Sequence, residues 1–446
     1  MKTYLLIFCS LMYSICLFGQ NYYMATPQGF GANATGGGNV TPVTVTTYTA
    51  FKNALLSTSP ANAVILVSGT IDCEYTSVQL NNKSIIGLPG AKLRNLQITV
   101  GNSTTSAANS GILNIKPNSN NVIIRNLIFE GPGAYDVDGR DNLTNEGTNI
   151  WVDHCEFQDG MDGNFDNKGA ADNITISWCK FTYLKAPIAG GSGGSNDHRF
   201  TNLVGSSASD ATADGHYSIT FQNCYWANGC KERMPRARNA ELHLVSCYYN
   251  TSVPSAKAIG LGGGTNNSTC YVENTNFATV ANVYTYYSGD GGTVAVAFNN
   301  CINGASNIGT VSAPSYSTTP IPVNEVEALL TDSTCGAGAT LQVSASGVIT
   351  PSSCATLSNP KVNEQTIRFF TSMADKNIEI HFPSAIANEL EVAIYSLNGQ
   401  ETNKYKYKNL VSNEVIKINI ENLAKGIYCC NVTFDNQMES WKFIKN

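Results

Sequence analysis

The sequence predicts an all-β protein in which a long solenoid of stacked short strands is followed by a small β-sandwich. Three observations lead to this prediction. A nine-residue pattern with alternating apolar positions recurs through the middle of the chain. The composition changes after about Pro360. The chain has 446 residues, more than one ordinary compact domain holds, and it is rich in Gly, Asn, Ser and Thr, which suit β-structure with many turns.

Residues 1–19 are predicted to be a signal peptide. Lys2 supplies the positive start, and an apolar run from Leu5 to Phe18 follows it. The run is too short for a comfortable membrane span, although an N-terminal anchor is the alternative. After the leader, Tyr48–Leu56 has the pattern of a short amphipathic helix that would cap the open end of the solenoid, and Ala63–Ser68 and Lys83–Gly87 are predicted strands.

The repeated pattern has apolar residues at or near its second and fourth positions and, in most copies, an aromatic residue at its end. Its seven copies start at Asn121, Asn149, Asn173, Ser218, Glu241, Thr269 and Ala295. The intervals are 23 to 28 residues apart from one of 45, which predicts a long insertion or an extra coil. Short strands at such a period, with no helical stretch between them, are typical of a solenoid that stacks equivalent residues about 4.8 Å apart.

The seventh position of the repeat is cysteine in five copies. These residues are Cys155, Cys179, Cys224, Cys247 and Cys301. We interpret this column as small apolar packing inside the solenoid, because thiols on successive coils do not converge on one metal ion. Cys335 and Cys354 lie outside the repeats and form a candidate disulfide, whereas the state of Cys73 and Cys230 stays open.

The chain beyond the repeats has two parts. Residues 304–323 are rich in Ser, Thr and Pro, and Val323–Leu330 is predicted to be a helix folded back on the solenoid. Alternating segments then occur in the last part of the chain, at Ile378–Phe382, Leu390–Gln400, Val415–Ile420 and Gly426–Phe434, with Asn398-Gly399 as a turn. We therefore expect a solenoid domain over residues 20–358 and a β-sandwich over residues 359–446.

The overall charge is weakly acidic, with a formal net charge of −6 and only 13% charged residues. This balance argues against nucleic-acid binding. A polyanionic ligand would need positive charge that is concentrated locally.

Carboxylates are concentrated in one stretch of the repeats. Asp162 and Asp166 stand four residues apart, a spacing that keeps both on one face of a strand. Asp141 belongs to the preceding coil, and Asp138 is a weaker fourth member. A carboxylate cluster without His or thiol ligands favours a hard cation such as Ca²⁺. The alternative is a set of solvated turns.

Positive charge is concentrated further along the chain. Lys231, Arg233, Arg236 and Arg238 fall within the eight residues KERMPRAR. Arginine pairs bidentately with carboxylates, so a polyuronate is a plausible ligand, and a solvated basic loop is the alternative. Lys185 follows a repeat strand and is expected on the same face of the solenoid, where a plain surface charge is the other interpretation.

Other motifs carry less information about chemistry. The glycine-rich stretch from Gly190 to Gly194 lacks the sequence of a phosphate loop and is interpreted as an insertion loop. The five histidines have no metal-site or triad spacing. His154 and His243 lie within repeat strands and are expected to be structural.

Taken together, four ordered motifs resemble polysaccharide lyase family 1, the pectate lyases, over roughly residues 25–356. They are GFGANATGG from Gly29, NKSIIGLPGA from Asn82, WVDH from Trp151 and RMPRAR from Arg233. The resemblance implies a right-handed parallel β-helix. It also implies a secreted enzyme that cleaves de-esterified pectin, or polygalacturonate, by Ca²⁺-dependent β-elimination to unsaturated oligogalacturonides.

The resemblance implies roles for particular residues. Arg233 corresponds to the catalytic base and Arg238 to a supporting, substrate-binding residue, and Arg236 is also expected to bind substrate. Asp141, Asp162 and Asp166 correspond to the primary Ca²⁺ ligands. Lys185 corresponds to the lysine that contacts the substrate carboxylate. The interval from Asp166 to Lys185 is one residue shorter than in the family and Ala186–Arg199 looks like an insertion, so Arg199 is the alternative second catalytic cation. Because a catalytic arginine has to act as a base, we expect an alkaline optimum.

The C-terminal segment resembles a type IX secretion (type A) sorting domain, through VAIYSLNGQ, GIYCCNV and the terminal WKFIKN. This implies the type IX secretion machinery as a partner and an extracellular, cell-surface or secreted location; a carbohydrate-binding module is the rival interpretation.

We expect a monomer that binds pectin and no nucleic acid. Two other functions stay open: a pectin lyase acting on methyl-esterified pectin without Ca²⁺, and a non-enzymatic β-helical glycan-binding protein.

Overall fold

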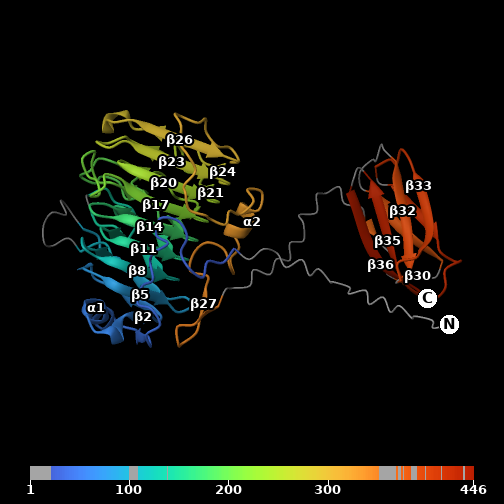
Figure 1. Ribbon diagram of the computed structural model, residues 1–446, viewed down its shortest axis with the longest axis horizontal. Coiled ribbons are helices and arrows are strands. Elements are labelled where there is room, and N and C mark those ends of the chain that lie inside the picture. Colours follow the sequence, from blue (N-terminus) through green and yellow to red (C-terminus); the bar gives the residue numbers. More distant parts are fainter. Residues whose placement is uncertain are drawn as a thin grey trace, which may run out of the picture. The chain divides into compact units, whose positions relative to one another are not determined.

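The computed structural model describes residues 22–99, 109–137, 139–350, 368–369, 373–374, 376–382, 389–396, 398–412, 414–434 and 437–446. The chain divides into two compact units, one within Gln20–Cys354 and one that includes Ala355–Asn446. The larger unit is a parallel β-solenoid whose coils are stacked one on the next (Figure 1). The predicted signal peptide, residues 1–19, lies outside the described residues.

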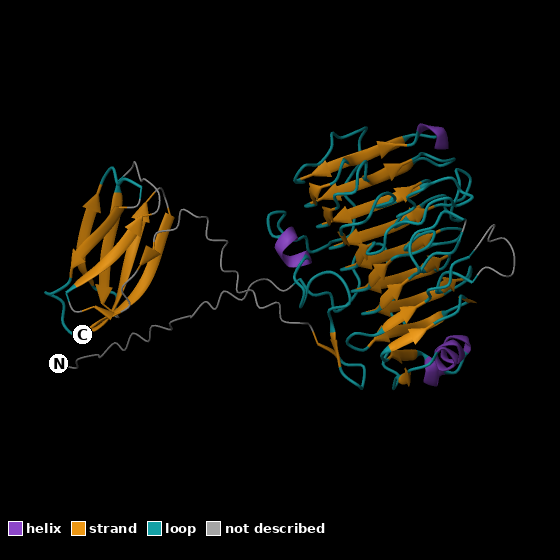
Figure 2. Cartoon of the chain, turned by 180° about the vertical axis from the view of Figure 1, so that it is seen from behind, coloured by secondary structure: helices purple, strands orange, loops and turns teal. Residues whose placement is uncertain are grey.

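Three parallel sheets form the walls of the solenoid, and consecutive coils supply neighbouring strands (Figure 2). The first sheet contains β1 (Val43–Val45), β2 (Val64–Val67), β5 (Asn81–Gly87), β8 (Asn120–Arg125), β11 (Thr148–Asp153), β14 (Asp172–Ser177), β17 (Tyr217–Gln222), β20 (Ala240–Val245), β23 (Ser268–Glu273) and β26 (Val294–Asn299). The second contains β4 (Thr76–Val78), β7 (Leu113–Ile115), β10 (Leu143–Asn145), β13 (Phe165–Asn167), β16 (Leu203–Val204), β19 (Arg236–Ala237), β22 (Lys257–Leu261) and β25 (Asn282–Tyr286). The third contains β3 (Thr70–Asp72), β6 (Lys92–Arg94), β9 (Ile128–Glu130), β12 (Glu156–Gln158), β15 (Lys180–Thr182), β18 (Tyr225–Trp226), β21 (Tyr248–Asn250) and β24 (Asn276–Thr279). The predicted parallel β-helix is confirmed.

A single left-handed residue bends the chain between the first and third sheets in successive coils. These corner residues are Asn126, His154, Trp178, Asn223, Ser246, Asn274 and Asn300, with φ between 47° and 58°. Asparagine tolerates this conformation better than most residues, because its short side chain hydrogen-bonds locally. The bend aims the following residue, the seventh of the repeat, into the interior.

The seventh position is therefore an interior column, as predicted. Cys155, Cys179, Cys224 and Cys247 are fully buried free thiols, and Cys301, on the last coil, is partly exposed. Cys73 and Cys230, whose state the sequence left open, are also buried and free. Cys335 is disulfide-bonded, but its predicted partner, Cys354, lies outside the described residues.

The aromatic residues that end the repeats form a second interior column. Phe129, Phe157, Phe181, Trp226, Tyr249 and Phe277 stack in chain order, with ring centroids 4.6 to 5.5 Å apart. All six are essentially buried. Stacking of equivalent residues from coil to coil thus builds the core that no single coil could build alone.

Both helices predicted for the solenoid are present, one at its N-terminal end and one against its side, although the second is shorter than the predicted Val323–Leu330. Helix α1 (Tyr48–Leu56) packs Phe51, Ala54 and Leu55 into the core beside β1 and β2. Helix α2 (Val326–Leu330) folds back on the solenoid, where Val326 and Leu330 join a buried cluster around Trp178. Short 3-10 helices, Pro60–Asn62 and Ser288–Asp290, and the hairpin of β27 (Gln342–Val343) and β28 (Ile349–Thr350) complete this unit.

The long interval between the third and fourth repeats contains no extra coil. The chain leaves β15, runs through a loop to β16, and runs through a second loop, residues 205–216, to β17. The interval is therefore an insertion divided between two turns of one coil. The first of these loops, residues 183–202, contains the predicted Gly190–Gly194 insertion.

The C-terminal unit is a two-sheet sandwich, as predicted. One sheet holds β29 (Arg368–Phe369), β31 (Asn377–Phe382) and β34 (Glu414–Asn419); the other holds β30 (Met373–Ala374), β36 (Gln437–Lys445), β35 (Gly426–Phe434), β32 (Leu390–Ser396) and β33 (Glu401–Tyr407). Alternate residues such as Ile378, Val392 and Val432 fill its core. Gly399, with φ 80°, turns the chain between β32 and β33. In the described part of the chain, no helix has the length and apolarity to cross a membrane.

Candidate active site

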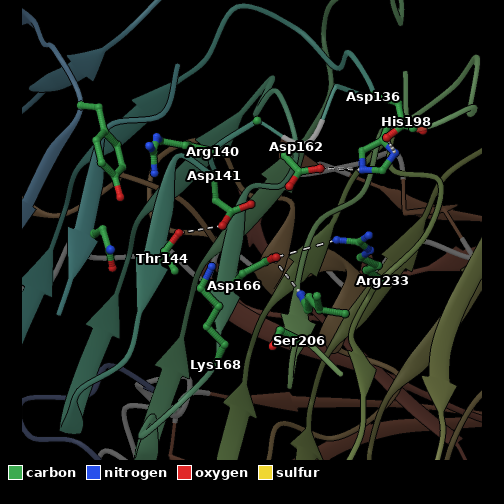
Figure 3. Close-up of a pocket in the computed structure, with 15 residues that line it drawn as sticks. Asp136, Arg140, Asp141, Thr144, Asp162, Asp166, Lys168, His198, Ser206 and Arg233 are labelled. Atoms are coloured by element: carbon green, nitrogen blue, oxygen red, sulfur yellow. Dashed lines mark hydrogen bonds and ion pairs between the residues drawn. The ribbon is translucent and has the colours of Figure 1, made fainter. Parts of the chain in front are cut away.

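A cavity of about 470 Å³ opens beside the second sheet and collects polar side chains from several coils (Figure 3). Asp141 lies just before β10, Asp166 lies on β13, and Thr144 pairs with Asp166 across the two strands. Asp162 was expected on the same strand as Asp166, but it lies in the preceding turn instead. The three predicted ligand carboxylates nevertheless line one cavity.

The carboxylates are only partly satisfied by the protein. Asp141 accepts a hydrogen bond from Thr144 Oγ1 at 2.6 Å through Oδ2, whereas its buried Oδ1 has no hydrogen-bond partner. Asp166 accepts one from the Leu203 N–H at 2.8 Å. A Cβ at Gly163 would lie 2.6 Å from Asp141 Oδ1 and 3.0 Å from Asp166 Oδ1, so glycine keeps the space beside these two oxygens open.

Burial and mutual repulsion disturb the titration of this group. Burial, followed by the charge of Asp162, raises the pKa of Asp141 to about 6. Burial and the charge of Asp141 raise the pKa of Asp166 well above its usual range. Burial also opposes ionisation of Asp162, but the hydrogen bond from His198 and the charge of Arg233 outweigh it, so its pKa is lowered. Lys168 and Arg233 lower the pKa of Asp141, and Arg233 lowers that of Asp166, but burial and mutual repulsion outweigh these charges.

The donor set fits a hard divalent cation. Asp141, Asp162 and Asp166 offer oxygen ligands only, one oxygen of Asp141 is buried and unpaired, and Gly163 leaves room beside it. Ca²⁺ prefers such carboxylate oxygens. A second group nearby, Asp136, Asp162 and His198, brings one ligand atom from each residue within 4.8 Å of the others.

Arg233 enters the cavity from the chain segment before β19. Its Nη1 lies 3.8 Å from Asp166 Oδ2, and its guanidinium carbon lies 4.8 Å from the centre of the Phe200 ring. Its backbone has φ 59°, a conformation rare outside glycine, and its carbonyl accepts hydrogen bonds from Asn202 N–H and Thr201 Oγ1. These contacts hold a strained residue in place, a feature common at functional sites.

Arg236 and Arg238 do not line this cavity in the structure. Both pair with Asp290, at 3.2 Å from Arg236 Nη2 and 3.0 Å from Arg238 Nε. The guanidinium of Arg236 also stacks on Tyr287 at 4.0 Å. Burial, followed by the charge of Arg236, lowers the pKa of Arg238. Arg233 adds to this effect, which places the three arginines close enough to act on one another electrostatically.

Lys185, the predicted second catalytic side chain, also does not line the cavity. Lys185 Nζ donates a hydrogen bond to the Gly131 carbonyl at 2.7 Å and lies 3.4 Å from Glu130 Oε1. Its alternative, Arg199, forms a two-bond pair with Asp197, with both distances at 2.7 Å. Asp138 lies outside the described residues.

Among the cavity residues that were not singled out from the sequence, four have acidic or basic side chains: Asp136, Arg140, Lys168 and His198. Lys168 stands two residues after Asp166, and this period-2 spacing was a signal that it belongs to the same face. Burial would lower the pKa of Lys168, but the charges of Asp141, Asp166 and Glu146 outweigh it and the pKa is raised. His198 lies in the insertion loop, between Asp136 (3.2 Å) and Asp162 (3.0 Å), and no periodicity points to it.

Comparison with known proteins adds two family matches. A model described as pectate lyase matches residues 4–343, and a secretion system C-terminal sorting domain model matches residues 374–446. A pectate trisaccharide-lyase of Thermotoga maritima is 35% identical over 206 residues, covering 44% of this chain and 47% of the relative. One of Bacillus licheniformis is 29% identical over 307 residues, covering 65% of this chain and 79% of the relative.

The chain thus spans about half the length of the Thermotoga relative (47%). A solved pectate lyase structure from Paenibacillus sp. 0602 matches with a TM-score of 0.51 and 18% identity, covering 72% of this chain and 97% of that chain. At this identity the similarity shows the shared fold only.

Proposed function

This chain belongs to the pectate lyase family, and from that premise we propose that it is a calcium-dependent pectate lyase that cleaves de-esterified pectin by β-elimination. Its C-terminal sorting domain indicates a secreted, cell-surface-exported protein. The observation that carries the proposal is the meeting of Asp141, Asp162, Asp166 and Arg233 in one cavity.

The proposed Ca²⁺ ligands are Asp141, Asp162 and Asp166. When bound, Ca²⁺ would supply positive charge that ties the substrate carboxylate to the site and makes the adjacent C5 proton more acidic. Asp141 Oδ1 and the space beside Gly163 support this assignment. The polyuronate is therefore recognised through its own carboxylates, which methyl esterification would remove.

Arg233 is the proposed base that removes the C5 proton. The electron pair then forms the C4–C5 double bond as the bond between C4 and the glycosidic oxygen breaks, and that oxygen takes up a proton from water. Among Arg233, Arg236 and Arg238, Arg233 is the one that lines the same cavity as the carboxylates, and Phe200 and the two hydrogen bonds to its carbonyl hold it there. This supports Arg233, rather than Arg236 or Arg238, as the group that reaches the reacting carbon.

Arg238 and Arg236 are proposed to support the site from the same coil as Arg233. Asp290 holds both guanidinium groups, so they supply a fixed positive field next to Arg233. Lys185 is proposed to contact a substrate carboxylate, which requires its Nζ to leave the Gly131 carbonyl. Arg199 is the alternative, and it would first have to break its ion pair with Asp197.

We further propose that the mature enzyme is a monomer released after removal of residues 1–19, with the solenoid in residues 20–358. The sorting domain, residues 359–446, would be handled by type IX secretion machinery. Mass spectrometry of the secreted protein would locate both ends.

The test is the ultraviolet absorbance of unsaturated uronates released from polygalacturonate, with added Ca²⁺ or with chelator. We expect a rise that requires Ca²⁺ and is lost in Arg233→Ala. A rise that is insensitive to chelator and larger on methyl-esterified pectin would instead establish a pectin lyase. Binding of polygalacturonate without any rise would establish a glycan-binding protein and overturn the proposal.

A further inference from the structure

One guanidinium in the cavity has no acidic partner. Arg140 lines the cavity directly beside Asp141, yet among the described residues no carboxylate forms an ion pair with it. Its Nε is buried without a hydrogen-bond partner. Its guanidinium carbon lies over the Tyr75 ring, 4.1 Å from the ring centre. An oriented and unpaired guanidinium is suited to receive an anion.

The position of Arg140 sets it apart from the proposed catalytic residues. Arg140 lies just before β10, and Tyr75 lies just before β4, two strands away in the second sheet. Its side chain therefore extends toward the N-terminal coils, whereas Arg233 lies on the opposite side of the carboxylates. Figure 3 shows this separation, with Arg140 beside Asp141 and away from Arg233 and His198.

Further polar atoms without partners line the same end of the cavity. Asn114, on β7 between β4 and β10, has a buried Oδ1 with no hydrogen-bond partner among the described residues. It is joined by Asp141 Oδ1 at the boundary with the proposed calcium site. Buried polar atoms without partners are uncommon in folded proteins. Both of these atoms are acceptors, so Asn114 Oδ1 suits a sugar hydroxyl and Asp141 Oδ1 suits the proposed cation.

We propose that Arg140, held by Tyr75, is a subsite for the carboxylate of a uronate residue next to the one that undergoes cleavage, and that the acceptor Asn114 Oδ1 receives a hydroxyl of the same sugar. The inference rests on the proposed function, because a polyuronate presents one carboxylate on each sugar. Neighbouring strands are about 4.8 Å apart, which is close to the length of one sugar residue. A chain laid across the strands would thus bring successive carboxylates to the calcium site and then to Arg140.

Tyr75 is a positioning residue in this arrangement. The face of its ring attracts the guanidinium and restricts its rotation, so less entropy is lost when Arg140 binds a carboxylate. The guanidinium could then form two parallel hydrogen bonds with the carboxylate. A lysine at this position would offer a point charge without that geometry.

The experiment compares steady-state kinetics of Arg140→Ala, Arg140→Lys and Tyr75→Leu with wild type in saturating Ca²⁺, on polygalacturonate and a series of short oligogalacturonides. We expect KM on polygalacturonate to rise about tenfold in Arg140→Ala, with kcat within about twofold, because a binding contact to a non-reacting sugar is lost. The KM of Arg140→Lys should lie between the values of wild type and Arg140→Ala. Tyr75→Leu should raise KM although it removes no charge. On oligomers too short to reach the subsite, wild type and variants should agree.

Arg94→Ala is the matched control. Arg94 lies on β6 in the third sheet, pairs with exposed Asp72, and is placed in no binding role. An unchanged KM in Arg140→Ala, or a fall in kcat with unchanged KM, would overturn the subsite.

A second measurement distinguishes failure of the subsite from failure of the proposed function. If wild type released no unsaturated product, the proposed function would fail, but retardation of the protein in gels containing polygalacturonate would still test Arg140. Retardation that is weaker in Arg140→Ala than in wild type would support the subsite, and equal retardation would reject it.

Discussion

Arg233 Nη1 lies 3.8 Å from Asp166 Oδ2, too far for a hydrogen bond but close enough for each charge to act on the other. Arg233, the proposed base, and Asp166, a proposed metal ligand, are therefore adjacent but are not hydrogen-bonded to each other. Arg233 is held instead by Phe200 and by hydrogen bonds to its own carbonyl. This arrangement leaves the guanidinium able to face a substrate bound over the carboxylates.

Replacing Arg233 should abolish catalysis without unfolding the protein. We expect Arg233→Ala and Arg233→Lys each to lower kcat at least about 100-fold, because a positioned base contributes that much or more. Initial rates of unsaturated product release measure this loss. The thermal unfolding temperature should stay close to that of Arg94→Ala, and a variant that keeps more than about a tenth of the wild-type rate would contradict the assignment.

Calcium should stabilise the protein through the three carboxylates. At a Ca²⁺ concentration about 100 times the dissociation constant, binding to the folded state adds about 2.7 kcal/mol to the free energy of unfolding. Differential scanning calorimetry with Ca²⁺ or chelator should show a higher unfolding temperature with Ca²⁺. Asp166→Asn should lose most of this shift, whereas Asp72→Asn, in the third sheet, should keep it; equal shifts in both variants would place the ion elsewhere.

Asp290 should act on catalysis through the arginines that it holds. Asp290→Asn keeps the size of the side chain but removes the charge that pairs with Arg236 and Arg238. We expect kcat/KM on polygalacturonate to fall about tenfold, the order of one lost charge-assisted contact. Asp290→Glu should recover part of this loss. Wild-type kinetics in Asp290→Asn would show that the pairing has no functional role.

Acid should destabilise the solenoid through Asp153, which is fully buried and pairs with Arg125 at 2.7 Å. Burial opposes its ionisation, but the charges of His154 and Arg125 outweigh burial and lower the pKa of Asp153. A lowered folded-state pKa contributes stability above the unfolded value of about 4, and this stability is lost as the pH falls through the folded pKa.

The corresponding variant is Asp153→Asn. Its free energy of unfolding at neutral pH should be about 3–5 kcal/mol lower than that of wild type, because Arg125 is left buried without its counter-charge. Its unfolding free energy should then fall less steeply than that of wild type below about pH 4. Urea unfolding in chelator at several pH values measures both effects, and parallel pH profiles would contradict the lowered pKa.

The aromatic column should contribute strongly to stability. Phe181 is fully buried between Phe157 and Trp226, at centroid distances of 5.3 and 5.5 Å. Phe181→Ala should lower the free energy of unfolding by about 3–5 kcal/mol, because it removes buried apolar surface and leaves a cavity. Leu184→Ala, at a side chain that is 69% exposed, should change it by less than about 0.5 kcal/mol. Urea unfolding curves distinguish the two.

The repeat made the fold predictable. Positions seven and nine of the pattern became the cysteine and aromatic columns, because stacked coils place equivalent residues over one another. The same periodicity brought Asp141 and Asp166 to neighbouring coils. It misplaced Asp162, because this residue lies in a turn, where the period-2 rule of a strand does not hold.

The amino-acid sequence alone determined the solenoid, the sandwich, the helices at the solenoid's edges and the carboxylates that share a cavity. Only the tertiary structure decided that Arg140 lies on Tyr75, that His198 lies between Asp136 and Asp162, and that Asp290 holds Arg236 and Arg238. The difference has a physical cause. Strand residues follow a repeated register that can be counted along the chain, whereas these partners come from turns and insertions whose lengths differ from coil to coil, so their contacts depend on how the whole solenoid folds.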